Sequence, residues 1–306
     1  MKLSVCVPVY NGAKTIGALV ERVISVCAGR DLEIVLVNDG SRDSSEAVCK
    51  GLAERFAPVT AITLRRNFGE HNAVMCALAN CTGDYAAVID DDFQNPPEEI
   101  EKLLEEALKG YDVVYSRYRL KKHNIFRNLG SLFNDLMATA LMHKPRDLYL
   151  SSFKVIARPI IDEIVKYKGP FPYIDGLILR ATASISAVYV EHSAREEGRS
   201  NYTLGKLVNL WLNMFVNYSI RPMRVISLVG LATSTLSFVL GIAFLVGRIQ
   251  HPTDPRGWAS IVVLVLFLGG VQTLALGIIG EYVGKNYLDK NGTPQWTIKS
   301  KHTRGR

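Results

Sequence analysis

The sequence predicts an α/β domain with a mostly parallel sheet, followed by a part that crosses a membrane, and three features support this. Short β-branched apolar runs alternate with segments of helical periodicity over the first 200 residues. Strands and helices that alternate in this way form βαβ units around a parallel sheet. Polar residues directly follow several of the apolar runs. Nearer the C-terminus, two uncharged runs of about 22 residues are each long enough to cross a bilayer as a helix.

The predicted elements follow from the spacing of apolar residues. Strands are expected at 3–9, 33–37, 59–64 and 85–89, with helices between them at 15–26, 44–56 and 72–79. Another helix is expected after Pro96-Pro97, because prolines and the acidic residues that follow suit a first turn. Later strands are expected at 112–116, 153–157 and 187–190. Ligands of such sheets bind beyond the carboxyl ends of the strands, so the polar residues that follow these strands should meet at one edge.

The net charge and the cysteines limit the classes of function. A formal net charge of +7 suits an anionic partner, such as a nucleic acid, a phosphate-bearing substrate or a lipid headgroup. No nucleic acid is expected, because the basic residues gather beside the apolar runs and no binding motif for nucleic acids is present. Five cysteines without a C-x-x-C pair are expected to be reduced, packed thiols: Cys6, Cys27, Cys49, Cys76 and Cys81.

The apolar runs and their flanks predict the organisation of the chain. We expect a first domain at 1–200, an amphipathic juxtamembrane helix at 201–222, transmembrane helices at 223–247 and 258–281, a connecting loop at 248–257 and a basic tail at 282–306. A further amphipathic stretch lies at 124–142. Lysines and arginines flank the hairpin on its outer sides, whereas the loop has only Arg248 and Arg256. Both termini are therefore expected to be cytoplasmic, and the apolar run at 3–9 is too short for a signal peptide.

The segment V-I-D-D-D-F-Q-N-P-P at 88–97 places three carboxylates where a strand leaves the sheet. Three like charges repel one another, and a hard divalent cation with oxygen ligands would relieve that repulsion. Such a cation could also hold two phosphates of a nucleotide. The alternative is a solvated acidic turn, but the position at the ligand edge of a parallel sheet favours a metal site.

Six motifs together resemble one enzyme family. They are P-V-Y-N-G at 8–12, V-N-D-G-S-R-D at 37–43, R-N-F-G at 66–69, D-D-D-F-Q-N-P-P at 90–97, R-E-E-G-R-S-N-Y at 195–202 and G-E-Y-V-G-K at 280–285. The set resembles the family 2 inverting glycosyltransferases, which have the Rossmann-like GT-A fold. More narrowly, it resembles the branch that uses polyprenyl phosphates, which includes dolichol-phosphate mannose synthases, prenyl-phosphate glucosyltransferases and undecaprenyl-phosphate formamido-arabinose transferases. The resemblance covers almost the whole chain.

This resemblance implies a reaction and a location. The chain would move a sugar from a nucleotide-diphosphate donor, with uridine favoured, to undecaprenyl phosphate at the cytoplasmic face of a bacterial inner membrane. The product would serve the cell envelope, for example in the modification of lipopolysaccharide. Relatives of this kind often form homotetramers, which sets the expectation for this chain. The sugar itself is not identified by the sequence.

The resemblance also implies roles for individual residues on the donor side. Asp90 and Asp92 would be the catalytic D-x-D pair, and they would bind Mg²⁺ or Mn²⁺ together with Gln94. The nucleotide pocket would be lined by Pro8, Tyr10, Asn11, Asp39, Asn67, Gly69 and the variable middle residue Asp91. Ordinary local roles remain open for three of these, with Gly69 in a turn, Asn11 as a cap and Asp39 as an acceptor in a tight turn.

A lipid phosphate needs fixed cations beside it, and arginine suits that task. The residues implied for the acceptor phosphate are Arg117, Arg127, Ser131, Arg199, Ser200 and Tyr202. Because the attacking phosphate oxygen is already anionic, the reaction hardly needs a general base. The segment S-S-F-K at 151–154 departs from the Gly-Asp-Phe-Arg pattern that is common in relatives, so Ser152 is not expected to be a base, and Asp147 is a weak substitute.

Two other functions are considered. A processive polysaccharide synthase would resemble this chain only in its donor domain and would carry a Q-x-x-R-W motif, which the sequence lacks. A membrane-tethered nucleotide-binding module without turnover is the second alternative. The presence of Asp90, Asp92 and Gln94 argues against that module. Release of nucleoside diphosphate that depends on metal and prenyl phosphate separates the three functions.

Overall fold

The computed structural model describes residues 1–118, 148–191 and 258–304, together with residues 226, 228–233, 235, 236, 239 and 242, which are helical. The described chain divides into two compact units, one of residues 1–207 and 292–306 and the other of residues 208–291. Several predicted segments lie outside the described residues. They are the amphipathic stretch at 124–142, the juxtamembrane helix at 201–222, the loop at 248–257 and most of the first predicted span.

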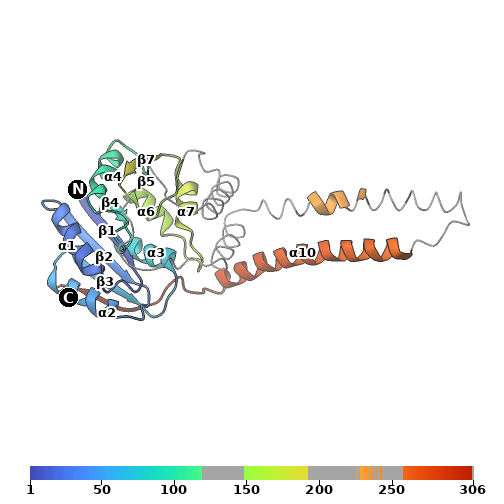
Figure 1. Ribbon diagram of the computed structural model, residues 1–306, viewed down its shortest axis with the longest axis horizontal. Coiled ribbons are helices and arrows are strands. Elements are labelled where there is room, and N and C mark those ends of the chain that lie inside the picture. Colours follow the sequence, from blue (N-terminus) through green and yellow to red (C-terminus); the bar gives the residue numbers. More distant parts are fainter. Residues whose placement is uncertain are drawn as a thin grey trace, which may run out of the picture. The chain divides into compact units, whose positions relative to one another are not determined.

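The first unit is built on one eight-stranded mixed sheet with the order β7-β5-β6-β4-β1-β2-β3-β8 (Figure 1). The strands are β1 (Lys2–Val9), β2 (Asp31–Asn38), β3 (Val59–Leu64), β4 (Tyr85–Val88), β5 (Val113–Tyr118), β6 (Lys154–Ala157), β7 (Ile185–Val190) and β8 (Ile298–Thr303). Strands β1 to β4 pair in parallel, as do β5 and β7, whereas β6 and β8 run antiparallel to their neighbours. The predicted parallel arrangement is therefore confirmed for β1 to β4, whereas β6 and β8 make the whole sheet mixed.

Helices cover both faces of this sheet because its central strands are apolar on both sides. The helices are α1 (Ile16–Val26), α2 (Ser45–Arg55), α3 (Glu70–Asn80), α4 (Glu99–Ala107), α6 (Arg158–Ile164) and α7 (Ile174–Ala181). Helices α1, α2 and α4 share one buried cluster with the sheet, and α3, α6 and α7 share the other. Figure 1 shows α1 and α3 on opposite sides of β1 and β2. Helix α4 begins just after Pro96-Pro97, as predicted.

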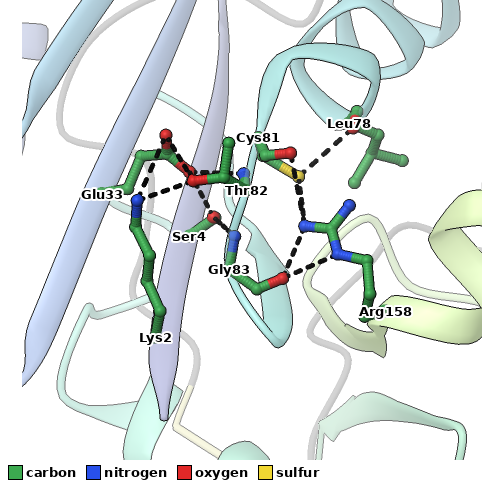
Figure 2. Close-up of polar contacts among 8 residues, drawn as sticks. All are labelled: Lys2, Ser4, Glu33, Leu78, Cys81, Thr82, Gly83 and Arg158. Atoms are coloured by element: carbon green, nitrogen blue, oxygen red, sulfur yellow. Dashed lines mark hydrogen bonds and ion pairs between the residues drawn. The ribbon is translucent and has the colours of Figure 1, made fainter.

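A polar network at the amino-terminal edge of the sheet fixes the connection from α3 to β4 (Figure 2). The Glu33 carboxylate accepts hydrogen bonds from the Ser4 hydroxyl at 2.6 Å and from the Thr82 N–H at 2.7 Å. The Arg158 guanidinium donates to the Gly83 carbonyl and lies 3.4 Å from the Cys81 sulfur. A hydrogen bond from Cys6 lowers the pKa of Cys81 to about 7, against the effect of burial. All five cysteines are free and buried, as predicted.

Residues 282–306, predicted as a basic tail, include the end of a helix and a strand that the sequence did not predict. Residues up to Lys290 belong to helix α10, and β8 joins the sheet as an edge strand antiparallel to β3. Lys299 binds the Glu46 carboxylate at 2.8 Å, and the buried Gln295 side chain donates to the Gly169 carbonyl at 3.1 Å. Lys299 and Lys301, which the sequence analysis counts among the membrane flanks, lie in this edge strand. Lysines on an edge strand protect the sheet from further pairing.

Helix α10 (Trp258–Lys290) is the long helix of the second unit (Figure 1). Within it, Phe267–Lys290 is long and apolar enough, by length and composition, to cross a membrane. Large apolar side chains are exposed along it, including those of Ile261, Phe267 and Leu276. Such exposure suits lipid better than water. The helix is a candidate for one of the two predicted crossings, and it continues past the predicted end at residue 281.

Candidate active site

The antiparallel pairing of β4 with β6 brings the D-D-D segment to Ser152. Val88 lies opposite Lys154 in this pairing, and the same register continued beyond the strands places Asp90 opposite Ser152. The Ser152 hydroxyl donates a hydrogen bond of 2.6 Å to Oδ2 of Asp90. On the other side of β6, Tyr115 lies opposite Lys154, so Arg117 on β5 comes at the level of Ser152. The edge of the sheet that carries the site therefore has the acidic segment after β4 and Arg117 on β5, with β6 between them.

The carboxyl group of Asp90 lies in an environment that disfavours its charged form. The pKa of Asp90 is raised to about 7, first because its carboxyl group is removed from water and then because of the nearby Glu70 and Asp92 carboxylates. The hydrogen bond from Ser152 and the charge of Lys154 act in the opposite direction. A cation at this position would favour the ionised form of Asp90.

Replacing Ser152 with alanine is expected to lower kcat/KM for sugar transfer about 10-fold, because Asp90 loses the hydrogen bond that orients its carboxylate. The apparent affinity for Mn²⁺ is expected to fall as well. Steady-state kinetics at varied Mn²⁺ concentration measure both effects. Ser25→Ala on the exposed face of α1 is the matched control. Unchanged kinetics in Ser152→Ala would show that Asp90 is oriented without Ser152.

Asp39 and Asn11 together join three loops of the predicted nucleotide pocket. Asp39 is 2% exposed, and its two carboxylate oxygens accept hydrogen bonds from the Phe68 N–H at 2.7 Å and the Gly69 N–H at 2.9 Å. Asn11 joins the first two loops, because its N–H donates to the Ser41 hydroxyl at 2.9 Å and its side-chain oxygen accepts from the Arg42 N–H at 2.9 Å. The loops after β1, β2 and β3 thus form one connected edge.

The other residues predicted for the nucleotide lie on the same edge. Pro8 is buried at the end of β1, and Tyr10 and Asn67 are exposed. Asp91 lies directly over Gly12, where an added Cβ would come within 2.0 Å of Oδ2 of Asp91. A glycine at position 12 is therefore what allows this close approach. The predicted donor residues are brought together by the fold, whereas their contacts with a nucleotide stay a prediction.

Two non-glycine residues at this edge have left-handed backbone conformations. Asn11 and Phe93 both have φ of 57°. Asparagine adopts this conformation readily, but for a bulky residue such as phenylalanine it is an outlier that surrounding structure must hold. Phe93 packs against the core cluster of α1 and α4, and the Gln94 N–H donates to Oδ1 of Asp92 at 3.1 Å. The turn that presents the acidic residues is therefore held in a strained shape, as is common at functional sites.

Of the six residues predicted for the acceptor phosphate, the structure describes Arg117. Its guanidinium lies over the ring of Tyr189, 5.2 Å from the centroid, on the neighbouring strand β7. The other five lie outside the described residues, namely Arg127, Ser131, Arg199, Ser200 and Tyr202. Asp147 lies outside them too.

A hydroxyl chain links the acceptor side of the edge to the segment after the acidic residues. The Ser116 hydroxyl donates to the Ser151 hydroxyl at 2.7 Å, which lies 2.9 Å from the Tyr118 hydroxyl. Tyr118 donates to the buried Asn95 side chain at 2.7 Å. Ser151, the first serine of S-S-F-K, thus has a structural role. This series of hydrogen bonds fixes β5 relative to the D-D-D-F-Q-N-P-P segment.

Sequence reasoning missed a buried ion pair beneath this edge. Lys154 and Asp175 are 4% and 7% exposed and form a salt bridge. Asp175 also accepts a hydrogen bond of 2.9 Å from the Tyr115 hydroxyl, and the ammonium group of Lys154 lies 5.0 Å from the centroid of the Tyr115 ring. The partners are 21 residues apart and no sequence motif joins them. The one available signal was a lysine that opens an otherwise apolar strand.

Replacing Lys154 with methionine is expected to lower the free energy of unfolding by about 3–5 kcal/mol, because Asp175 would remain buried without its cation. Chemical denaturation followed by tryptophan fluorescence measures this loss. The double variant Lys154→Met/Asp175→Leu is expected to recover most of the stability, since no buried charge is left unpaired. A double variant as unstable as Lys154→Met would contradict this account.

The donor atoms at the edge fit a divalent metal of the Mg²⁺ or Mn²⁺ type. No group of three or more His, Cys, Asp or Glu side chains among the described residues is arranged to hold a metal without other ligands. Such ions, however, commonly use one or two carboxylates and take their other ligands from water and substrate phosphates. Asp90 and Asp92 supply such a carboxylate pair. Burial raises the pKa of Asp90 most, the nearby carboxylates of Glu70 and Asp92 raise it further, and a cation would offset both effects.

The parallel core, the helices on both faces and the acidic edge define a GT-A-like domain. The family model described as "Glycosyl transferase family 2" matches residues 4–165. The chain belongs to glycosyl transferase family 2, and it is therefore a glycosyltransferase.

Curated relatives extend the similarity over nearly the whole chain. An undecaprenyl-phosphate 4-deoxy-4-formamido-L-arabinose transferase from Enterobacter sp. (strain 638) is 33% identical, with 99% of this chain and 94% of that protein covered. The protein of that name from Pseudomonas fluorescens (strain SBW25) is 31% identical, with 97% of this chain and 89% of that protein covered. The resemblance predicted from the motifs is confirmed.

Solved structures confirm the fold of the first unit. Glucosyl-3-phosphoglycerate synthase from Mycobacterium tuberculosis, in complex with Mn²⁺, uridine diphosphate and phosphoglyceric acid, has a TM-score of 0.54 and 18% identity. That comparison covers 70% of this chain and 77% of the synthase. Another structure of the synthase contains Mn²⁺ and uridine-diphosphate-glucose, with a TM-score of 0.53. At this level of identity the likeness shows the fold of the first unit.

Proposed function

We propose that this chain transfers a sugar from a uridine-diphosphate donor to undecaprenyl phosphate, with inversion at the anomeric carbon, on the cytoplasmic face of a bacterial inner membrane. The observation that supports this most is the similarity to undecaprenyl-phosphate sugar transferases over 94% of a relative's length. The geometry of the edge supports the same reaction, because β6 lies between the acidic turn and Arg117. The uridine donor is supported by the ligands of the structural neighbours.

The proposed reaction is a single displacement. An oxygen of the acceptor phosphate forms a bond to the anomeric carbon, and the bond from that carbon to the donor diphosphate breaks. The electron pair leaves with the nucleoside diphosphate, and no proton has to be removed from the nucleophile because the phosphate is already anionic. The residue at position 152 therefore does not have to be a base, and the hydroxyl of Ser152 orients the Asp90 carboxylate instead.

Charge neutralisation and positioning then supply the catalysis. Asp90 and Asp92, with Gln94 beside them, would hold the metal, which would supply positive charge to the departing diphosphate. Asn11, Asp39 and the loop at 67–69 would receive the nucleotide. Arg117 would fix the acceptor phosphate together with Arg127, Ser131, Arg199, Ser200 and Tyr202, as the family resemblance implies.

The membrane part of the proposal has two crossings. Helix α10 is long and apolar enough for one of them, and the uncharged run at 225–246 would provide the other. A helix at 201–222 would lie at the interface and bring the lipid phosphate to the site edge. A homotetramer is part of the proposal, and the mass of the detergent-solubilised protein tests it.

The test is an assay of the purified full-length protein in detergent with Mn²⁺ and a panel of uridine-diphosphate sugars. Release of uridine diphosphate is expected only when undecaprenyl phosphate is present, and chelation of the metal is expected to stop it. Mass spectrometry of the lipid product identifies the sugar. Equal release with and without the lipid, or transfer that continues in a chelator, would overturn the proposal.

A further inference from the structure

Glu70 is a carboxylate at the site edge to which neither the motifs nor the proposed reaction gives a role. It is the first residue of α3 and follows directly after Phe68 and Gly69. The backbone N–H groups of these two residues are held by the buried Asp39 carboxylate. The loop that leads into α3 is therefore fixed to the end of β2, and Glu70 is fixed at the same edge as the D-x-D pair.

The surroundings of Glu70 are mostly negative. Its carboxylate interacts electrostatically with Asp92, Asp175 and Lys154, and it raises the pKa of Asp90. Among the residues that the structure describes, none donates a hydrogen bond to the Glu70 side chain or forms a salt bridge with it. A carboxylate held beside two others is unfavourable unless something binds there.

The groups nearby that could neutralise Glu70 are already engaged. Lys154 is buried in its salt bridge with Asp175 and lies over the ring of Tyr115. The His71 ring packs edge-on against Tyr173, 5.3 Å between centroids, and burial lowers the pKa of His71 to about 4. Glu70 as a residue is exposed to solvent, although the protein around its carboxyl group removes water from it and thereby raises its pKa. A molecule that enters the edge from outside can therefore reach this residue.

The chemistry of Glu70 decides which part of the donor it can contact. A carboxylate repels the diphosphate, so the nucleotide's phosphates are unsuitable partners. Sugar hydroxyls and amide N–H groups are donors that a carboxylate accepts well. The sugar is joined to the diphosphate that the D-x-D pair would hold, and Glu70 is fixed at the same edge of the sheet as that pair.

We propose that Glu70 is a specificity-determining residue that accepts a hydrogen bond from a hydroxyl or amide N–H of the donor sugar. This inference rests on the proposed function, since it presumes a nucleotide-sugar donor. It adds to the site a residue that recognises the sugar and lies in the first turn of α3, whereas the other site residues lie at or after the ends of strands.

The test compares uridine diphosphate with a uridine-diphosphate sugar as ligands. Affinities are measured by calorimetry with Mn²⁺ for the wild-type protein, Glu70→Gln and Glu70→Ala, using the donor that the wild-type protein turns over best. Glu70→Ala is expected to raise Kd and KM for the nucleotide sugar at least about 10-fold, and to change Kd for uridine diphosphate less than about 2-fold. Glu70→Gln keeps one acceptor oxygen and is expected to lie between the two.

Glu54→Gln is the matched control, because Glu54 is exposed on α2 and pairs with Lys50 on its own helix. Thermal unfolding of each variant verifies that the fold is kept. An equal loss of affinity for uridine diphosphate and for the nucleotide sugar would place Glu70 at the metal or the diphosphate and overturn the inference. Unchanged affinity for both would overturn it as well. A wild-type protein that binds no nucleotide sugar would overturn the proposed function together with it.

Discussion

Replacing Asp90 with alanine is expected to reduce kcat/KM for sugar transfer by about 10²–10³-fold, because one of the two carboxylates for the metal is lost. The affinity for Mn²⁺ is expected to fall in parallel. The effect should be larger than that of Ser152→Ala. Ser152 only orients the Asp90 carboxylate, whereas Asp90→Ala removes it. Calorimetry with Mn²⁺ and the lipid-dependent release of uridine diphosphate measure the two losses.

The pKa of Asp90 adds a pH dependence to this prediction. A proton must leave the carboxyl group when a metal binds, so protonation competes with the metal below a pH of about 7. Affinity for Mn²⁺ in the wild-type protein is therefore expected to rise with pH up to about that value and then to level off. Titrations at several pH values test this.

Asp31→Ala is the control, because Asp31 is exposed at the start of β2, on the edge opposite to the site. It is expected to keep both Mn²⁺ affinity and activity. Transfer at the wild-type rate by Asp90→Ala would contradict the metal role of the acidic segment, and so would an affinity for Mn²⁺ that does not depend on pH.

Replacing Gly40 with alanine is expected to lower the free energy of unfolding by about 2–4 kcal/mol and to abolish nucleotide binding. Gly40 has φ of +60°, and an added Cβ would lie 2.4 Å from the carbonyl carbon of Arg66 and 2.6 Å from the nitrogen of Asn67. Both contacts are with backbone, which cannot rotate away as a side chain does. The loop after β3 would have to move, and the hydrogen bonds from Phe68 and Gly69 to Asp39 would be strained.

Gly51→Ala is the matched control for Gly40→Ala. Gly51 lies in α2 and an added Cβ would meet nothing within 4 Å, so alanine is expected to stabilise the protein by about 0.5–1 kcal/mol. Denaturant unfolding measures both variants, and calorimetry with uridine diphosphate measures binding. If Gly40→Ala unfolded at the same denaturant concentration as the wild-type protein, the close approach of these loops would be disproved.

The donor edge could be predicted from the sequence because its residues follow consecutive parallel strands. Once β1, β2 and β4 are recognised, Asn11, Asp39 and Asp90 must lie at the same edge, whatever the details of packing. The acidic run could be read as a metal site because its repulsion is local in the sequence. The structure confirms that these residues share one edge and adds the hydrogen bonds that join the loops, whereas the metal site stays a prediction.

Other parts of the site depend on pairings between distant segments, which periodicity does not reveal. Ser152 meets Asp90 only because β6 runs antiparallel to β4, and Lys154 meets Asp175 only because α7 packs on that face. Strand β8 was missed for a different reason. Its lysines fit two patterns, a membrane flank and a protected sheet edge, and the neighbouring apolar helix made the first pattern the more obvious one.

The pairing of β8 with β3 restricts the topology of the whole chain. Residues 2–190 and 298–303 contribute to one sheet, so the polypeptide that leaves this domain must come back to the same compartment. If α10 crosses a bilayer, a second crossing is therefore required elsewhere between residues 191 and 297. An odd number of crossings would put β8 on the far side of the lipid from the strand it pairs with.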